Sequence, residues 1–386
     1  MKTRAAALVV VFGSCLLAAL STGGKVYLLF ALLLAVMTLL ALASVVLAGR
    51  SAAVSHTLSS SKVQRGDAVS LEVTVKHSGL LPIAPILLTL SAAPGEPPME
   101  VRLTGGGSKS QRIAYRFSTA HVGTFSPGVQ SYIVQDVFGF FSKKKIPDTP
   151  PLELMVLPVP FEVESLRFSP GDTGLETLSR AQEDPSSPSD VRSYQPGDPL
   201  KKIHWKLSMR KRELMVRRFE DPALPDALVL LDCAPPTSPV PAQPQGQAFV
   251  RDALCETAAS VVLHQMRGDN PVRLPLLGSR PMEYEKSMGA PALLEELARL
   301  DFSNTERFER VLMLETRRLK RTGATVVITS RLNSAVVDMI INIRKMGPYV
   351  RLYLVSYTPD APNVLPLISR LQQSTVEVCY VTPCEG

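Results

Sequence analysis

Residues 191–220 contain the densest group of side chains that could bind or process an anion. Between Lys201 and Arg218, eight lysines and arginines accompany a single acidic residue, Glu213. Clustered cations repel one another unless something anionic offsets them. The chain's only tryptophan, Trp205, lies in their midst. The segment could therefore dock an acidic partner or an anionic surface, or it could stabilise negative charge in a catalytic site.

A catalytic use of this segment would employ Asp198 and His204 beside the cations, in a phosphodiester or peptide hydrolase. Such chemistry also requires a base within hydrogen-bond reach of a nucleophile, and donors at the developing charge. The sequence has no paired carboxylates, Gly-x-Ser-x-Gly motif or Cys/His arrangement that would supply these parts. We therefore favour a binding role, and we expect no catalytic residue and no cofactor.

Asp232 is the second candidate, because it ends the apolar run LVLLD (228–232), which is typical of a buried strand. A carboxylate there could bind a divalent cation if hydroxyl groups followed it. Ala234 and Pro236 stand at those positions, and Arg331 follows the next core strand. One carboxylate without oxygen partners is a poor ligand set for a hard cation. We expect a degenerate site without metal, in which Asp232 caps a loop or helix.

Composition and charge limit the possible metal sites, disulfides and binding partners. The five cysteines form no Cys-x-x-Cys pair, which disfavours disulfides and thiolate zinc sites and is compatible with a reducing compartment. The five histidines form no i, i+4 pair, so the usual zinc-hydrolase pattern is absent. The net charge of +7 suits an anionic membrane surface as well as nucleic acid. Because no aromatic residue besides Trp205 is interleaved with the cations, we expect no nucleic-acid partner.

Residues 1–50 are predicted to form a transmembrane hairpin. Its two apolar segments cover about 5–22 and 26–47, and the second would extend roughly 33 Å as a helix, enough to span a bilayer. Cations flank the hairpin on both outer sides, whereas the turn has only Lys25. The positive-inside rule therefore places both ends in the cytoplasm of a multi-pass cell-membrane protein. The first segment also resembles a cleaved signal peptide, which is the alternative.

Residues 55–157 alternate apolar and polar side chains with period two. In SLEVTVKH, for example, Leu71, Val73 and Val75 share one face. Such runs between Gly- and Pro-rich breaks predict an all-β, immunoglobulin-like sandwich. The stretch DVFGFFSKKK is predicted to form its edge, with Lys143–Lys145 in a solvated loop or, alternatively, a binding patch.

Residues 227–386 alternate strand and helix patterns, after a linker and basic segment at 158–226. LVLLD and TVVIT (325–329) predict core strands, and apolar stripes predict helices, including one over 305–322 that ends at Gly323. This pattern is typical of an α/β, Rossmann-like sheet with helices on both faces. Ligands of such sheets bind at the carboxyl ends of the strands, where Asp232 lies.

The basic segment itself predicts a helix that begins at Asp198 as N-cap, with Pro199 in its first turn. Leu200, Ile203 and Leu207 would form its apolar face, with lysines opposite. Trp205 would pack at a buried junction with its indole N–H bonded to a backbone carbonyl. We expect this helix to brace the two domains and to dock an acidic partner through its basic face.

The same segment resembles the signature of the domain of unknown function 58 family, roughly Y-x-x-G-D-x-x-[RK]-x-I-x-W-[KR]-x-[ST]-A-[RK]-x-x-x-L-x-V-[RK]-x-[FY]-E. Met209 departs from the alanine, and the upstream HVGTFSPGVQSYIVQDVFGFF is similar to a second family stretch. The residues that match the signature, or that we assign with it to an interaction site, are Tyr194, Gly197, Asp198, Lys202, Ile203, His204, Trp205, Lys206, Ser208, Arg210, Leu214, Val216, Arg217 and Glu220.

The resemblance implies a membrane-tethered protein with a von Willebrand factor type A-like domain. It also implies neighbours: a MoxR-type AAA+ ATPase and a transglutaminase-like membrane protein. A type A metal site uses Asp-x-Ser-x-Ser, and its loss here agrees with members that lack the metal. The expected function is a cytoplasmic adaptor that serves the assembly or maturation of a client complex. The alternatives are a hydrolase that uses the basic segment and an anionic lipid-binding protein.

Overall fold

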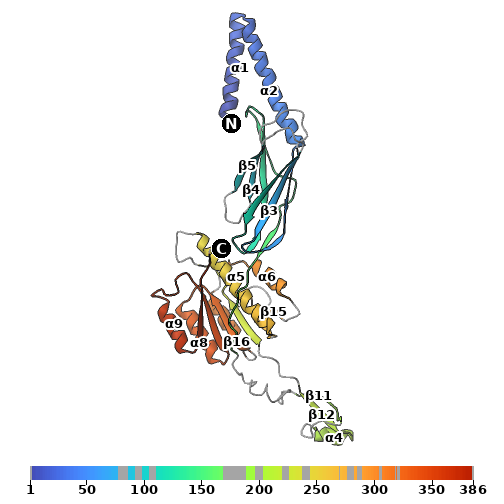
Figure 1. Ribbon diagram of the computed structural model, residues 1–386, viewed down its shortest axis with the longest axis vertical. Coiled ribbons are helices and arrows are strands. Elements are labelled where there is room, and N and C mark those ends of the chain that lie inside the picture. Colours follow the sequence, from blue (N-terminus) through green and yellow to red (C-terminus); the bar gives the residue numbers. More distant parts are fainter. Residues whose placement is uncertain are drawn as a thin grey trace. The chain divides into compact units, whose positions relative to one another are not determined.

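The structure is a computed structural model that describes residues 2–76, 86–91, 98–103, 110–167, 188–195, 203–219, 226–236, 244–268, 270–275, 282–284, 289–303, 307–317, 319 and 322–384. The chain divides into two compact units, residues 1–157 and residues 158–385. We call them the β unit and the α/β unit and describe each by itself (Figure 1).

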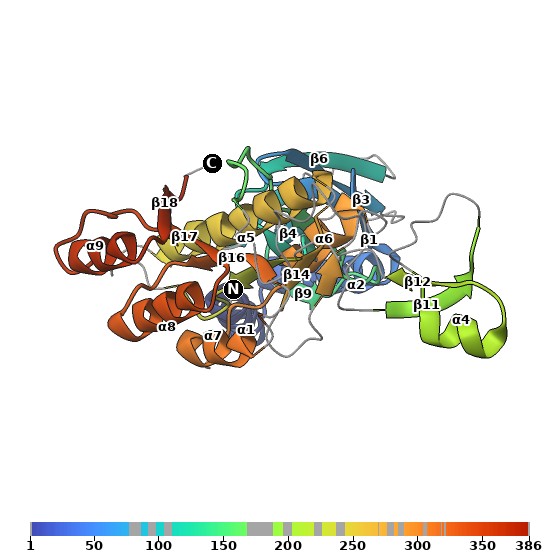
Figure 2. The ribbon, with the colours of Figure 1, turned by 90° about the horizontal axis from the view of Figure 1, so that it is seen from below.

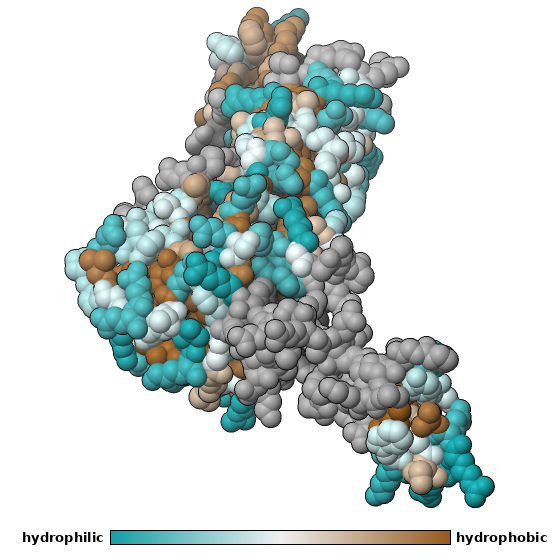
Figure 3. Space-filling view, turned by 60° about the horizontal axis from the view of Figure 1, so that its bottom comes forward, coloured by the Kyte–Doolittle hydropathy of each residue, from teal (hydrophilic) through white to brown (hydrophobic). Residues whose placement is uncertain are grey.

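Two antiparallel helices begin the β unit, α1 (Lys2–Thr22) and α2 (Lys25–Ser51). Gly23 joins them with a φ of 64°, a backbone conformation that glycine adopts without strain. α2 is long and apolar enough to cross a membrane, with a mean hydropathy of 2.8, and its side chains form an apolar surface (Figure 3). The apolar part of α1, Ala7–Thr22, is shorter.

The strands of the β unit form three sheets. The first has the order β1 (Ala53–Leu58), β3 (Ala68–Lys76), β6 (Ser110–Ser118), and the second β5 (Met99–Leu103), β4 (Ile86–Ser91), β8 (Gly128–Gln135), β9 (Ser142–Lys145). Three short strands, β2 (Lys62–Gln64), β10 (Leu154–Leu157) and β7 (Gly123–Phe125), form the third.

The predicted alternation in the β unit is confirmed in β3, where Leu71, Val73 and Val75 are buried in a core shared by all three sheets. The core also includes Ala48 and Ala52, so the end of α2 is packed against the strands. The prediction of a loop at Lys143–Lys145 is wrong. These lysines belong to the edge strand β9, because β8 provides its backbone partners.

The α/β unit is built on a six-stranded sheet in the order β15 (Met282–Tyr284), β14 (Val272–Leu274), β13 (Asp226–Leu231), β16 (Thr322–Thr329), β17 (Tyr349–Val355), β18 (Glu377–Val381). All neighbours are parallel except β14 and β15. Every residue of β16 is buried, which explains its continuous apolar pattern. The predicted mostly parallel sheet is confirmed.

Helices cover both faces of this sheet (Figure 2). α5 (Pro244–Arg267) and α6 (Ala290–Ala298) lie on one face. α7 (Phe308–Thr316), α8 (Ser334–Lys345) and α9 (Leu365–Gln373) share a core with the other.

The prediction of one helix over 305–322 is wrong. α7 ends at Thr316, and β16 begins at Thr322, so Gly323 lies inside a strand and ends no helix. The physical reason is pairing across the sheet. Thr322 lies opposite Asp226, and its hydroxyl accepts a hydrogen bond from Arg273 Nη2 at 3.0 Å. These contacts outweigh the helix propensity of the residues before Thr322.

Candidate functional site

The described residues around the basic segment, 188–195 and 203–219, form a small structure that we call the signature lobe. β11 (Pro188–Ser193) and β12 (Met215–Phe219) pair antiparallel, and α4 (Trp205–Lys211) precedes β12. Before α4 the chain also runs against β12. Ile203 forms a bridge with Val216, and His204 N donates to Met215 O at 2.8 Å. The backbone thereby brings residues that are distant in sequence into one small structure.

The prediction that Ile203 lies within the signature helix is wrong. α4 begins at Trp205, with His204 as N-cap, and Ile203 is extended because its backbone pairs with Val216. His204 Nδ1 accepts the amide hydrogen of Leu207 at 3.3 Å, which satisfies one free donor of the first turn. His204 therefore has a structural task. The predicted N-cap at Asp198 and the helical positions of Pro199 and Leu200 lie outside the described residues.

Ser208 connects α4 to β12. Its hydroxyl is buried, donates to His204 O at 3.0 Å and accepts from Met215 N at 2.9 Å. The match to serine or threonine at this position of the family signature thus has a physical basis, since a small hydroxyl closes the helix onto the strand.

The predicted burial of Trp205 is also wrong. Its side chain is 60% exposed, and that of Met209, one helical turn later, is 80% exposed. Ile203 and Ser208 occupy the buried side of the lobe, so the helical period turns Trp205 and Met209 outward together. Leu214 is exposed as well. The lobe therefore presents large apolar side chains to its surroundings (Figure 3).

The cations of α4 lie beside these apolar side chains. Lys206, Arg210, Lys211 and Arg212 are all exposed. Tyr194 is half-buried, and its amide donates to Leu214 O at 2.7 Å. Of the other predicted interaction residues, Gly197, Asp198, Lys202 and Glu220 lie outside the described residues, and only the backbone of Arg217 is described. Among described residues, the lobe thus combines aromatic, thioether and cationic groups on one element.

Asp232 lies at the carboxyl end of β13, 3% exposed. Arg331, which follows β16, approaches the carboxylate side-on. Its Nη2 donates to Oδ1 at 2.9 Å and its Nε to Oδ2 at 3.2 Å. Thr329 Oγ1 donates to Oδ2 at 2.8 Å, and Ala234 N donates to Oδ1 at 3.2 Å. Arg331 Nη2 also lies 3.2 Å from Oδ2, so Oδ1 has two donors and Oδ2 three, in the fork geometry that arginine and carboxylate favour.

This arrangement does not suit a divalent cation at Asp232. The guanidinium stands against the carboxylate and supplies the positive charge that a metal would bring. Cys233, the next residue, is buried, and burial raises the pKa of its thiol to about 12, with a further contribution from the Asp232 charge. A thiol with that pKa is protonated at neutral pH and is a weak nucleophile and ligand.

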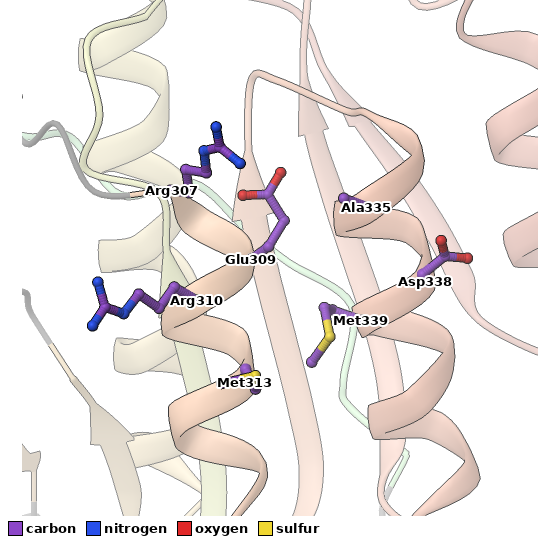
Figure 4. Close-up of a pocket in the computed structure, with 7 residues that line it drawn as sticks. All are labelled: Arg307, Glu309, Arg310, Met313, Ala335, Asp338 and Met339. Atoms are coloured by element: carbon purple, nitrogen blue, oxygen red, sulfur yellow. The ribbon is translucent and has the colours of Figure 1, made fainter.

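A groove between α7 and α8 lies beside this edge of the sheet (Figure 4). It encloses about 710 Å³. Met313 and Met339 supply apolar surface from the two helices, while charged groups line the rest. The lining residues are Arg307, Glu309, Arg310, Met313, Ala335, Asp338 and Met339.

Glu309 connects the groove to the Asp232 edge. Its Oε1 accepts from Asn333 Nδ2 at 2.8 Å. Burial alone would raise the pKa of Glu309, but the Asn333 hydrogen bond and the nearby charges of Arg307 and Arg331 hold that pKa below its ordinary value. The carboxylate is therefore ionised at neutral pH. Sequence patterns missed this groove, because the stripes that predict α7 and α8 identify buried faces and not the gap left between two helices.

The described features define a chain with an apolar, membrane-length helix, a β unit and an α/β unit with a largely parallel sheet. Residues 190–365 match the family described as "Protein of unknown function DUF58", so this part of the chain carries the features of that family. The match covers the signature lobe and most of the α/β unit. No curated protein matches the chain.

Solved structures match only distantly. The sporulation control protein Spo0M from Bacillus subtilis is 18% identical over 28% of this chain and 49% of its own, with a TM-score of 0.17. Cwp6 from Clostridium difficile is 10% identical over 85% and 53%, with a TM-score of 0.19. A GH20 exo β-N-acetylglucosaminidase from Vibrio harveyi is 9% identical over 84% and 59%, also with a TM-score of 0.19. The chain thus spans about half the length of these structures, and scores this low support no argument.

Proposed function

We propose that this protein is a membrane-tethered adaptor. In this proposal α1 and α2 both cross the cell membrane and the soluble units lie in the cytoplasm, where a von Willebrand factor type A-like domain engages protein partners. The partners are a MoxR-type AAA+ ATPase and a transglutaminase-like membrane protein, which act with the adaptor on a client complex. They come from the family resemblance, and the chain's own features support a docking role.

One observation carries the proposal: Trp205 and Met209 are exposed on a lobe whose backbone is fixed by hydrogen bonds. Large apolar side chains that face water in a cluster are typical of interaction sites. Tryptophan and arginine are also the side chains that most often dominate binding energy at interfaces. The His204 cap and the Ser208 bridge fix the helix that presents them. Such an element is pre-organised for a partner, which lowers the entropy cost of binding.

The cations of α4 indicate an acidic partner. Lys206 and Arg210 are exposed one turn apart, next to Trp205 and Met209. Cations at the rim of an apolar patch steer a partner of opposite charge and favour its correct orientation. An acidic segment with one or more apolar residues would match both features.

The closed Asp232–Arg331 pair supports docking that does not depend on a metal. In a type A-like domain the ligand edge lies at the carboxyl ends of the strands, and here a guanidinium already engages the aspartate. The sheet order and the helices on both faces are compatible with this domain type, as the β unit is with an immunoglobulin-like sandwich. The hydrolase alternative loses support, since His204 caps a helix with the nitrogen that would act as base.

Capture of the tagged full-length protein in detergent, followed by mass spectrometry, tests the proposal. We expect a MoxR-type AAA+ ATPase to be enriched with the wild type. Met209→Ala, or Lys206→Glu combined with Arg210→Glu, should reduce that enrichment, and capture should weaken as salt rises.

Met346→Ala is the matched control, because Met346 is also exposed, at 59%, but lies at the end of α8. It should leave capture unchanged. Equal capture by the wild type and the Met209→Ala and charge-reversed variants would exclude the lobe as the docking site. Recovery of the protein alone, with hydrolase activity that His204→Ala abolishes, would favour an enzyme instead.

A further inference from the structure

The β8–β9 hairpin packs against the end of α2, the helix that is long and apolar enough to span a membrane. Tyr132 Oη donates to Ala52 O at 3.1 Å. A side chain at Gly49 would come within 3.5 Å of Lys143 Cδ. Tyr132 and Val134 share a core with Ala52. The hairpin therefore has a fixed place beside the helix.

The direction of the hairpin follows from its register. Tyr132, which reaches Ala52, pairs with Lys145, and Val134 pairs with Lys143, which reaches Gly49. Along β8 the chain thus runs backwards along α2, towards the apolar segment that ends at Leu47. The tip of the hairpin, residues 136–141, comes after Gln135 in this direction. The tip therefore points towards the level at which α2 would enter a bilayer.

The tip has a rigid backbone and an apolar surface. The buried Asp136 carboxylate accepts the amides of Phe138 at 2.9 Å and Phe141 at 2.6 Å. Val137 and Phe138 are nevertheless 55% and 48% exposed, and the Phe138 ring stacks on Phe140 at 5.7 Å. Because these hydrogen bonds already order the backbone of the turn, binding through its exposed apolar side chains costs little further chain entropy.

Cations surround the same end of the β unit. Lys143 and Lys144 follow the tip on β9 and are exposed, and Lys145 is half-buried. Arg50 at the end of α2 and Lys76, paired with Ala53 at the start of β1, are exposed as well. Within the described part of the chain, none of these five forms an ion pair with a carboxylate. Among the described residues, no carboxylate therefore offsets this group of positive charges through an ion pair.

We infer that this surface, the tip at 136–141 with its flanking cations, docks onto the headgroups of anionic phospholipids. Cations next to a spanning helix attract the negative surface of a leaflet, and long lysine side chains extend to the headgroups while their stems stay on apolar atoms. The exposed Phe138 and Val137 enter the interface between headgroups and acyl chains. The surface sets the angle and depth at which the β unit stands on the membrane. The inference rests on the membrane anchoring in our proposed function and not on the adaptor role.

Fluorescence of a single tryptophan tests this contact. Trp205 is the chain's only tryptophan, so Trp205→Phe with Phe138→Trp leaves one reporter at the tip. The full-length protein is placed in nanodiscs of phosphatidylcholine with brominated acyl chains, with or without phosphatidylglycerol. We expect the reporter to be quenched by the bromines and its emission to shift to the blue. Both effects should be larger with phosphatidylglycerol and should weaken in ~1 M salt, where the Debye length is about 3 Å.

Two variants make the result specific. A tryptophan at Met99 instead of Phe138 is the matched control. Met99 is also exposed, but it pairs with Leu90, and Leu90 lies at the end of β4 that is farther from the tip of the hairpin. This tryptophan should not be quenched. Replacing Lys143, Lys144 and Lys145 by glutamine should abolish the difference between the two lipid compositions.

The outcomes separate this inference from the anchor on which it rests. Protein that does not co-elute with the discs contradicts the membrane anchor. Protein in the discs whose Phe138→Trp reporter is quenched no more than the Met99→Trp reporter overturns the docking inference. Quenching that is the same with and without phosphatidylglycerol rejects the recognition of anionic headgroups and leaves the lysines as a solvated edge.

Discussion

At the scale of single residues, the pair of Asp232 and Arg331 shows how one arginine can occupy the edge at which parallel sheets usually bind ligands. The carboxylate lies where open parallel sheets bind ligands, and Arg331 closes over it. The sequence pointed to both residues, because one ends a core strand and the other follows the next. It could not reveal the two-point contact, which depends on how β13 and β16 align in the sheet.

We predict that Arg331→Ala destabilises the sheet edge by about 2 kcal/mol. Removing one partner of a buried pair costs ~3–5 kcal/mol, and the figure is reduced here because the Arg331 side chain is 34% exposed. Asp232→Ala should cost a similar amount, because the guanidinium can reach water but the buried Thr329 hydroxyl and Ala234 amide lose their acceptor. Hydrogen exchange at the Asp232 amide, which donates to Ile328 O, measures both effects. Strict additivity in the double variant would contradict coupling between the two side chains.

His56 provides a prediction about pH. The ring is buried in β1, Nδ1 lies 3.3 Å from Thr149 Oγ1, and Gly128 leaves no room beside Nε2. Burial lowers the pKa of His56 below its ordinary value of 6.5, and a backbone hydrogen bond at Pro150 offsets this only in part. Below pH 6.5 the unfolded chain therefore takes up a proton that the folded state refuses.

The stability of the β unit should consequently fall as pH drops below 6.5, by up to about 1.4 kcal/mol per pH unit, and level off below the folded pKa. Thermal unfolding in detergent across this range measures the slope. His56→Gln cannot titrate, so its stability should lack this slope whatever its absolute value. A slope unchanged in His56→Gln would assign the effect to other groups of the β unit.

At the scale of elements, α4 marks the limit of sequence patterns. An i, i+3, i+7 stripe predicted a helix from Asp198, yet Ile203 supplies a strand-like bridge to Val216. The same apolar residue serves either structure, and only its partner decides which. Where the pattern is clear, as in β3, the sequence was sufficient, and for β16 it predicted the core of the strand at 325–329 but not its start at Thr322.

Exposure of Trp205 could not be predicted for a related reason. Tryptophan is buried in most folds, and the basic residues around it are compatible with either a solvated face or an interface. Among the described residues of the lobe, the buried ones are Ile203, Ser208, Met215 and Val216, which together fill a small interior. The large ring is thus excluded from the small core.

A matched pair of substitutions tests this description of the lobe. Ser208→Ala leaves the Met215 amide without its acceptor in a buried place, which should cost about 1–3 kcal/mol locally. Trp205→Ala removes an exposed side chain and should change local stability by less than about 0.5 kcal/mol. Hydrogen exchange at Met215 distinguishes them, because only Ser208→Ala should accelerate it. Acceleration by Trp205→Ala would mean that the ring is packed after all.

At the scale of the whole molecule, the organisation follows from three kinds of pattern. A long apolar run, a period-two region and a strand–helix alternation each predict their part: the first matches a membrane-length helix, and the other two reflect burial within the β unit and the α/β unit. The functional surfaces are different. The α7–α8 groove lies between two separate helices, and the tip at 136–141, although it is one continuous stretch, is positioned beside α2 by the contact of Tyr132 with Ala52, so no local pattern predicts either position.

The last prediction concerns topology. Cations precede α1 and follow α2, whereas the turn has only Lys25, so both chain ends should be cytoplasmic and the turn external. A cysteine in the turn tests this with a membrane-impermeant maleimide on intact cells. Ser21→Cys is the best site, because Ser21 is exposed and similar in size, whereas Gly23 has a φ of 64° that a side chain would strain. Cys15→Ser removes the other cysteine of α1.

Cys384 is the internal control for that experiment. Its side chain is exposed, so it reacts wherever the reagent can reach it. We expect label at residue 21 in intact cells and at Cys384 only after the membrane is permeabilised. If Cys384 reacts in intact cells while residue 21 does not, the orientation is reversed. If residue 21 is missing from the mature chain and Cys384 reacts, α1 is a cleaved signal peptide and α2 alone anchors an external protein. Either result would remove a cytoplasmic ATPase from the possible partners of the signature lobe.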